Sequence, residues 1–147
     1  MASSNPPEGY ATVTPSLVSD NPAGLIDFIV EVFEADVRMR MDMPDGSLGH
    51  AELQLGDPVI MLGQASEYVP AATGALYVYV DDVDHTYERA LAAGAASTME
   101  PADQFYGDRC GAVADPFGNL WTIAKHVEDV SDEEMARRME AFAEQQG

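Results

Sequence analysis

The stretch GDRCGAVADPFGNLWTIAKH, Gly107–His126, places a Pro-Phe-Gly-Asn turn between two runs of strand-forming residues. A related stretch, GHAELQLGDPVIMLGQ, occurs earlier at Gly49–Gln64, and in both an Asp-Pro pair follows the opening glycine at the same spacing. Strand-forming runs on either side of a glycine-containing turn are typical of a β-hairpin. The shared spacing indicates that one small unit of structure occurs twice in the chain.

The segments before each hairpin repeat the same order of expected elements. The first half reads β, α, β, β, β, with strands expected over 10–18, 36–43, 50–56 and 59–63 and a helix that begins after Asp20 or Asn21, with Pro22 in its first turn. The second half has strands expected over 75–84, within 97–107, over 109–115 and over 120–126, and a helix over 85–95 that ends at Gly94. The sequence therefore predicts two βαβββ modules.

The alternation of side chains predicts which sheet faces are polar. Over 50–56, Ala51, Leu53 and Leu55 alternate with His50, Glu52 and Gln54, so one face meets a core and the other something polar. Each module leaves one sheet face that it cannot cover alone. We expect paired modules, within one chain or between two, to enclose a cavity.

Composition excludes several classes of partner. The 147 residues include 26 acidic and 7 basic side chains, a formal net charge of −19. Such a charge repels phosphate backbones and anionic membranes, so we expect neither a nucleic-acid nor a membrane partner, whereas cationic ligands are attracted. An acidic surface that reflects a salty cytoplasm or a GC-rich genome is the alternative explanation.

A single cysteine, Cys110, excludes an intramolecular disulfide and any multi-cysteine metal site. The N-terminal stretch MASSNPPEGYATV has no basic region followed by an apolar one, and no apolar run is long enough to span a bilayer. We therefore expect a cytoplasmic protein.

The expected organisation has three parts. Residues 1–9 are rich in Ser, Pro and Asn and are predicted to be a disordered tail. A single domain follows over 10–130, with module one at about 10–64 and module two at about 73–127, and an amphipathic helix covers 131–147.

The C-terminal helix carries its own start signal. Ser131 is the expected N-cap, and Glu134 is its capping-box partner. Met135, Met139 and Phe142 form a stripe at helical spacing, which we interpret as a core or dimer contact.

The doubled βαβββ order, together with GHAELQLGD, LYVYVDDVD, GDRCGAVADPFGN and HVEDVS, resembles the vicinal oxygen chelate superfamily of glyoxalases, extradiol dioxygenases and bleomycin- and fosfomycin-resistance proteins. The PhnB-like, glyoxalase/bleomycin-resistance branch is the most similar, and the match runs from about Tyr10 to Arg138. The resemblance implies an α+β fold in which two βαβββ modules pair their curved mixed sheets around a cavity, a C-terminal helix and a homodimer. It does not specify an activity, because this scaffold supports isomerisation, ring cleavage, epoxide opening and drug sequestration.

In metal-dependent members of this superfamily, His, Glu or Gln side chains from the first and last strands of each module hold the ion. The corresponding positions here are Thr14, Met61, Ala75 and Thr122. Windows of two residues on either side, 12–16, 59–63, 73–77 and 120–124, contain no His, Asp, Glu, Gln or Cys. Hydroxyls are poor ligands for divalent transition metals beside those groups. We therefore expect no metal at the usual positions and no cofactor, with a divalent metal at a relocated site left open.

The same parity places an aromatic, hydroxyl-rich and acidic set of side chains toward the cavity. Tyr77 and Tyr79 offer stacking faces, and Glu52 and Asp108 offer charge for a cationic group. Tyr106, in the irregular loop over 100–109, is a lid candidate. The candidate ligand-binding residues are Thr14, Gln54, Tyr77, Tyr79, Tyr106, Asp108, Cys110 and Thr122, with Ala124 and His126 on the same face; His50 and Glu52 are the candidate catalytic residues.

Three functions compete. The first is a binding protein that sequesters a small aromatic or cationic organic molecule, as an antibiotic-resistance protein does. The second is a lyase, isomerase or epimerase in which His50 and Glu52 act as base and orienter, without metal or with relocated metal ligands. The third is a dimeric partner or regulator with a vestigial pocket. Cys110 has a structural alternative as a small buried side chain.

Overall fold

A computed structural model describes residues 3–146, and the chain divides into two compact units. Unit 1 comprises the described residues up to Gly74 together with Phe117–Asn119, and unit 2 comprises Ala75–Pro116 and the described residues from Leu120 onward. Residues 1 and 2 of the expected disordered tail lie outside the described residues. Within residues 3–146 every helix is too short or too polar to cross a bilayer.

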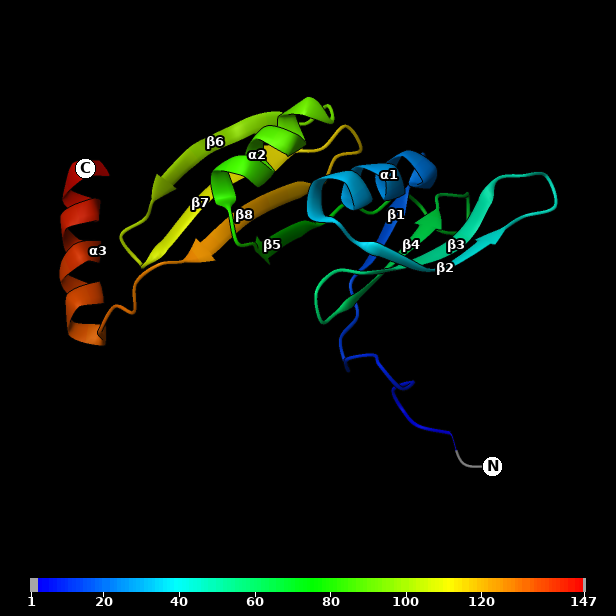
Figure 1. The fold of residues 1–147 in the computed structure, drawn as a ribbon, viewed down its shortest axis with the longest axis horizontal. Helices are drawn as coiled ribbons and strands as arrows, with labels where there is room; N and C mark the ends of the chain where they lie inside the picture. The colour runs from blue at the N-terminus through cyan, green and yellow to red at the C-terminus, as the bar shows by residue number, and fades with distance from the viewer. Residues whose placement is uncertain (1–2, 147) are drawn as a thin grey trace. The chain divides into compact units, whose positions relative to one another are not determined.

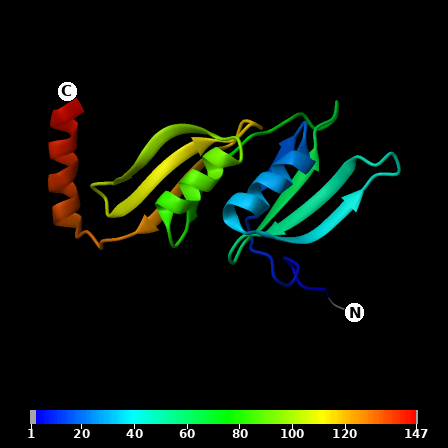
Figure 2. The same ribbon diagram turned by 45° about the horizontal axis from the view of Figure 1, so that its top comes forward.

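Unit 1 is a four-stranded mixed sheet with one helix. Its elements are β1 (Ser16–Ser19), α1 (Pro22–Phe33), β2 (Asp36–Asp42), β3 (Leu48–Gln54) and β4 (Val59–Gln64). The strand order is β1-β4-β3-β2, with β1 parallel to β4 and the other pairs antiparallel. Figures 1 and 2 show α1 against one face of this sheet.

Local sequence signals begin and end α1. The Asn21 side chain caps the helix by accepting a hydrogen bond from the Gly24 N–H at 3.1 Å, and Pro22 follows in the first turn. The helix ends at Glu34, whose backbone is left-handed with φ 57°. The core of unit 1 lies between α1 and the sheet, where Leu25, Ile29, Val32, Leu53 and Leu62 are fully buried.

Unit 2 repeats the plan of unit 1. Its sheet contains β5 (Ala75–Tyr79), β6 (Ala96–Asp103), β7 (Asp108–Ala114) and β8 (Leu120–His126) in the order β5-β8-β7-β6, and α2 (Val83–Ala92) packs on β6, β7 and β8 (Figure 2). The parallel pair is again first strand with last. The predicted doubled βαβββ architecture is confirmed.

The core of unit 2 includes the only tryptophan, Trp121, which is fully buried. Its Nε1–H donates to Asp115 Oδ2 at 2.8 Å, so the polar edge of the indole is satisfied inside the core. Fully buried Val113 and Ile123 come from neighbouring strands. Trp121 therefore belongs to the core, as its parity opposite to Thr122 predicts.

Some predicted boundaries were wrong. The strand expected over 10–18 begins only at Ser16, because Pro15 has no N–H to donate to a ladder and contributes only its carbonyl, which accepts from the Met61 N–H at 2.9 Å. Thr14 accordingly lies before the strand, and its hydroxyl donates to the Ala11 carbonyl at 3.3 Å. The second helix begins at Val83 rather than 85, since Asp82 is its N-cap.

The C-terminal helix α3 (Asp132–Gln146) contains no buried residue. Its N-cap is Ser131, whose hydroxyl accepts from the Glu134 N–H at 3.2 Å. Met139 and Phe142 remain 54 % and 44 % exposed, so they do not form a core contact within one chain. The Phe142 ring contacts the Phe105 ring, with centroids 5.1 Å apart.

Candidate functional site

The strand register of unit 2 gathers one group of polar side chains on a single sheet face. Tyr77 lies beside Thr122 across β5 and β8, and Asp108 lies beside His126 across β7 and β8. Tyr79 pairs with Ala124, which in turn pairs with Cys110. Because alternate residues of a strand share a face, all these side chains lie on the same side of the sheet.

Asp108 is the centre of this group. Its carboxylate is buried, and it accepts hydrogen bonds from the Tyr77 hydroxyl at 2.6 Å, the Tyr79 hydroxyl at 3.2 Å and His126 Nδ1 at 2.8 Å. Burial alone would raise its pKa, but the hydrogen bonds from Tyr77, His126 and Tyr79 outweigh that effect and lower the pKa of Asp108. Asp108 is therefore ionised at neutral pH.

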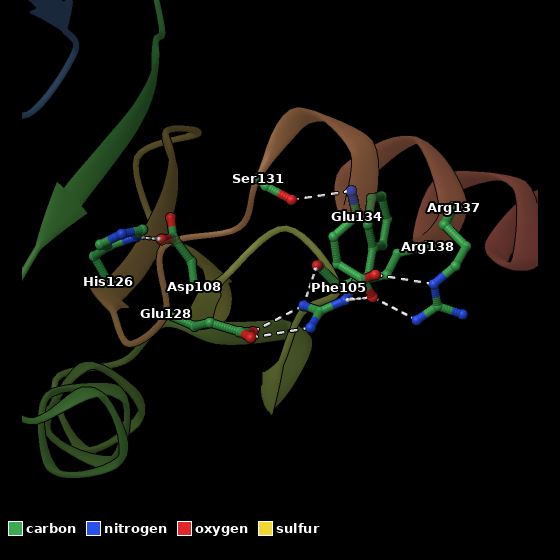
Figure 3. A network of polar contacts seen from close by, with 8 residues as sticks. All are labelled: Phe105, Asp108, His126, Glu128, Ser131, Glu134, Arg137 and Arg138. Carbon is green, nitrogen blue, oxygen red and sulfur yellow. Dashed lines mark hydrogen bonds and ion pairs between the residues drawn. The ribbon is translucent and has the colours of Figure 1, made fainter.

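His126 bridges two carboxylates. Nδ1 faces Asp108, and Nε2 lies 2.6 Å from Asp129 Oδ1 in the segment after β8; Figure 3 shows the pair of His126 and Asp108. The hydrogen bonds to Asp108 and Asp129 raise the pKa of His126. Both ring nitrogens donate only when the imidazole is protonated, so this geometry favours the imidazolium form.

Three tyrosines cover the buried part of the group. The Tyr106 hydroxyl lies 3.4 Å from Cys110 Sγ, and Cys110 is fully buried. Burial is the larger cause and the contact with Asp108 the next one that raises the pKa of both Tyr77 and Tyr79. Their phenols therefore stay protonated and act as donors. Burial first, and then the contact with Cys110, raises the pKa of Tyr106.

The rings of Tyr77 and Tyr79 remain accessible. They are 45 % and 63 % exposed, their centroids are 5.3 Å apart, and they are tilted by 56°. Two exposed aromatic rings thus donate their hydroxyls to one ionised carboxylate, which holds both hydroxyls in place. We name the residues Tyr77, Tyr79, Tyr106, Asp108, Cys110, His126 and Asp129 the tyrosine–aspartate cluster.

In unit 1 the predicted pair His50 and Glu52 is in contact. His50 Nε2 lies 3.1 Å from Glu52 Oε2, and the Glu52 side chain is buried. The Tyr10 hydroxyl donates to the other oxygen of the same carboxylate, and the Arg38 guanidinium lies 4.9 Å above the Tyr10 ring. Glu52 therefore orients His50 while it is itself held by Tyr10.

Gln54 serves the turn between β3 and β4. Its Nε2 donates to the Gly56 carbonyl at 2.8 Å and to the Asp57 carbonyl at 2.7 Å, and its Oε1 accepts from Arg38 at 3.2 Å. Both ends of the amide are occupied by the protein. The amide of Gln54 thus supports the turn, and its role in ligand binding stays a prediction.

The positions that hold metal in this fold can be checked against the strand register. The first and last strands pair Ser16 with Met61 and Tyr77 with Thr122, two residues away from Thr14 and Ala75 and inside the windows considered above. Their donors are two hydroxyls, a thioether and a phenol, which do not fit a divalent transition metal. Across residues 3–146, moreover, no three His, Cys, Asp or Glu side chains are grouped so that they could hold an ion.

Sequence reasoning missed two members of these groups, Tyr10 and Asp129. Tyr10 was expected to open a strand, and its contact with Glu52 spans 42 residues, so no local pattern points to it. Asp129 lies in the loop after β8, where no alternation defines a face. Parity did place Tyr77, Tyr79, Asp108 and Cys110 on one side of the sheet.

Comparison with known proteins agrees with the fold. The model of the Glyoxalase/Bleomycin resistance protein/Dioxygenase superfamily matches residues 11–123. Proteins of Mycobacterium bovis and Mycobacterium tuberculosis, both uncharacterized, are 36 % identical over 138 residues, which cover 86 % of this chain and 91 % and 81 % of theirs.

Solved structures show the same architecture. TioX from Micromonospora is 27 % identical with a TM-score of 0.66, and the match covers 78 % of this chain and 98 % of that one. The PhnB protein from Bacillus cereus, described as a 3-demethylubiquinone-9 3-methyltransferase of unproven activity, is 18 % identical with a TM-score of 0.64. That match covers 78 % of this chain and 99 % of the other, and it shows the fold alone.

Proposed function

Since the chain belongs to the Glyoxalase/Bleomycin resistance protein/Dioxygenase superfamily, we propose that it is a member that binds and sequesters a small aromatic or cationic organic molecule without a metal. The observation that carries this proposal is the tyrosine–aspartate cluster, in which Asp108 holds the hydroxyls of two tyrosines whose rings stay open. The cluster offers stacking surface and negative charge at one place.

Recognition would use the faces of the rings rather than the Asp108 oxygens. Asp108 already accepts from Tyr77, Tyr79 and His126, so it fixes the rings instead of meeting the ligand directly. Rings that are held before binding lose little freedom when a planar molecule stacks on them. Charges on Asp108, His126 and Asp129 add to about −1, which favours a cation above the rings.

A pair of planar probes tests the proposal. The cation 9-aminoacridine and the largely neutral acridine have similar shapes, so fluorescence titration at neutral pH separates stacking from charge. We expect the cation to bind more tightly, and Tyr79→Leu to weaken binding about tenfold because a stacking face is lost. The matched control is Tyr68→Leu, which removes a tyrosine that is 86 % exposed in unit 1. Equal losses in the two variants would refute the proposal.

A second pair of variants controls for the overall charge of −19. Asp108→Asn and Asp57→Asn each remove one negative charge, but only Asp108 holds the tyrosines. We expect 9-aminoacridine affinity to fall in Asp108→Asn and to stay close to wild type in Asp57→Asn. A similar small loss in both would mean that the probe responds only to net charge.

A second candidate function rests on the contact of His50 with Glu52. A side chain that can accept a proton, oriented by a buried carboxylate at 3.1 Å, is the arrangement of a general base and its orienter. It would suit a lyase, isomerase or epimerase that removes a proton next to a carbonyl. Catalysed exchange of deuterium from D₂O into carbonyl compounds, lost in His50→Ala with the fold intact, would favour this function over sequestration.

A further inference from the structure

The helix α3 is joined to the rest of unit 2 by a polar network although it contains no buried residue. Figure 3 shows Arg138 at the centre of this network, between α3, the loop that carries Phe105 and the segment that carries Glu128. The contacts of α3 with these two segments are therefore polar and directed rather than part of the core.

All three guanidinium nitrogens of Arg138 donate hydrogen bonds. Nη1 donates to the Phe105 carbonyl at 3.1 Å, and Nη1 and Nη2 together reach the Glu128 carboxylate at 2.8 and 3.0 Å. Nε donates to Glu134 Oε1 at 2.9 Å, within α3 itself. Hydrogen bonds from Arg138 lower the pKa of Glu128, so this pair stays ionised well into the acid range.

The two segments that accept hydrogen bonds from Arg138, those of Phe105 and Glu128, also contact each other through their backbones. The Gly107 carbonyl accepts from the Val127 N–H at 2.9 Å and the Glu128 N–H at 3.0 Å. Gly107 has a φ of 102°, and a Cβ there would lie 2.2 Å from the Glu128 carbonyl oxygen, so only glycine permits this approach. We call this backbone contact of Gly107 with Val127 and Glu128 the junction. The Arg138 guanidinium adds side-chain hydrogen bonds to the segments on both sides of it.

Both residues that Arg138 binds outside α3, Phe105 and Glu128, are next in sequence to a member of the tyrosine–aspartate cluster. Phe105 precedes Tyr106, whose hydroxyl lies 3.4 Å from Cys110 Sγ, and Glu128 precedes Asp129, which binds His126. A second contact supports the first segment, because the Phe105 ring packs on Phe142 of α3 at 5.1 Å and edge-on against Tyr106 at 5.3 Å. Through these neighbours α3 is connected to the cluster.

We propose that Arg138 is a positioning residue through which the C-terminal helix sets the places of Tyr106 and Asp129 in the tyrosine–aspartate cluster. Its effect on a ligand rests on the proposed binding function. Its effect on the cluster does not, and can be measured without any ligand. Lysine cannot replace it, because a single ammonium lacks the fork that reaches a carbonyl and a bidentate carboxylate together.

Neighbouring Arg137 provides a matched control. It lies on the same helix and binds the same Glu134, with Nε at 2.9 Å, but it is bound within α3 and is 70 % exposed. Arg138→Met and Arg137→Met therefore remove the same charge from adjacent positions. Only the first should release the junction.

The test measures two properties of the ligand-free protein by NMR. In Arg138→Met, the amides of Val127 and Glu128 should exchange about tenfold faster, because the junction opens more often. The pKa of His126 should fall, because Asp129 no longer stays at Nε2; its other partner Asp108 remains, with Tyr77 and Tyr79 behind it. Simple loss of a nearby cation would raise that pKa instead, so the direction separates positioning from long-range charge.

Unchanged exchange and an unchanged or raised pKa in Arg138→Met would overturn the proposal, as would equal effects in Arg137→Met. Phe142→Ala is a second variant that loosens Phe105 without altering charge, and it should speed the same amides. Arg138→Lys should behave like Arg138→Met; full rescue would contradict the need for the fork. If the junction loosens while 9-aminoacridine affinity stays at the wild-type level, the positioning role stands, and ligand binding rests on Tyr77 and Tyr79 without help from Tyr106. If 9-aminoacridine does not bind the wild-type protein, the proposed binding function fails and the positioning role is still judged by the exchange rates and the pKa of His126.

Discussion

Asp108 is a buried carboxylate on which two tyrosines and a histidine depend for their placement. Each of these donors should therefore add to stability according to its geometry. We expect Tyr77→Phe, which removes the 2.6 Å hydrogen bond, to lower the free energy of unfolding by about 1 kcal/mol. Tyr79→Phe, which removes the 3.2 Å bond, should cost less. Urea unfolding measures both, and the reverse order would contradict the network.

His126 predicts a specific dependence on pH. Its pKa is raised in the folded state, from an ordinary value of 6.5, by Asp108 and Asp129. A raised pKa contributes stability that is fully present below pH 6.5 and is lost as the pH rises through the folded value. The stability difference between wild type and His126→Asn should accordingly be largest near pH 6 and shrink toward alkaline pH. A difference that grows with pH would mean that the histidine is neutral in the fold.

At the residue scale, alternation along strands predicted part of the site. It placed Tyr77, Tyr79 and Asp108 together because side chains two apart share a face. It could not predict Tyr10, which reaches Glu52 from outside any strand, or that Gln54 would satisfy the turn after its own strand. Those contacts depend on loops, where no periodicity constrains direction.

Two helix caps with the same chemistry should differ in their effect on the protein. Asn21 caps α1, which covers the core of unit 1, whereas Ser131 caps α3, which buries nothing. Asn21→Ala should lower global stability by about 1 kcal/mol, the usual value of an N-cap. Ser131→Ala should leave the melting temperature nearly unchanged and speed amide exchange only in α3. A large drop in melting temperature for Ser131→Ala would show that α3 is part of the folding unit.

At the scale of elements, periodicity and turn residues predicted the order of all strands and helices. The predicted boundaries were wrong where a single residue determines them. After Pro15 β1 begins only at Ser16, and with Asp82 as its N-cap α2 begins at Val83. The amphipathic stripe of α3 was read correctly as helical, but its placement could not be predicted, because Arg138 and Phe142 find partners far away in the chain.

At the scale of the molecule, each unit covers one face of its sheet with a helix and leaves hydrophobic side chains exposed on strands, among them Met39 and Met41 of β2. We expect such faces to be partly covered in a homodimer, as the family resemblance implies. Size-exclusion chromatography with light scattering should give twice the mass of the chain. A monomer at micromolar concentration would contradict this expectation.

The sequence identified the superfamily and the absence of suitable donors at its usual metal positions, because both depend on residue types at fixed strand positions. It could not identify the ligand, since stacking on tyrosine rings accepts many planar molecules. Among candidate ligands, the net charge of −19 favours cations but does not distinguish one cation from another.

The most direct test is the melting temperature of chelator-treated protein, measured with 9-aminoacridine and, separately, with Zn²⁺, Ni²⁺, Mn²⁺ and Fe²⁺. A ligand that binds only the native state raises the free energy of unfolding, by about 2.7 kcal/mol at a hundredfold excess over Kd, and the melting temperature rises with it. The account predicts that 9-aminoacridine raises the melting temperature and that the metals do not. A rise with near-stoichiometric metal that disappears in His50→Ala, without any response to 9-aminoacridine, would contradict it and make this protein a metalloenzyme with relocated ligands.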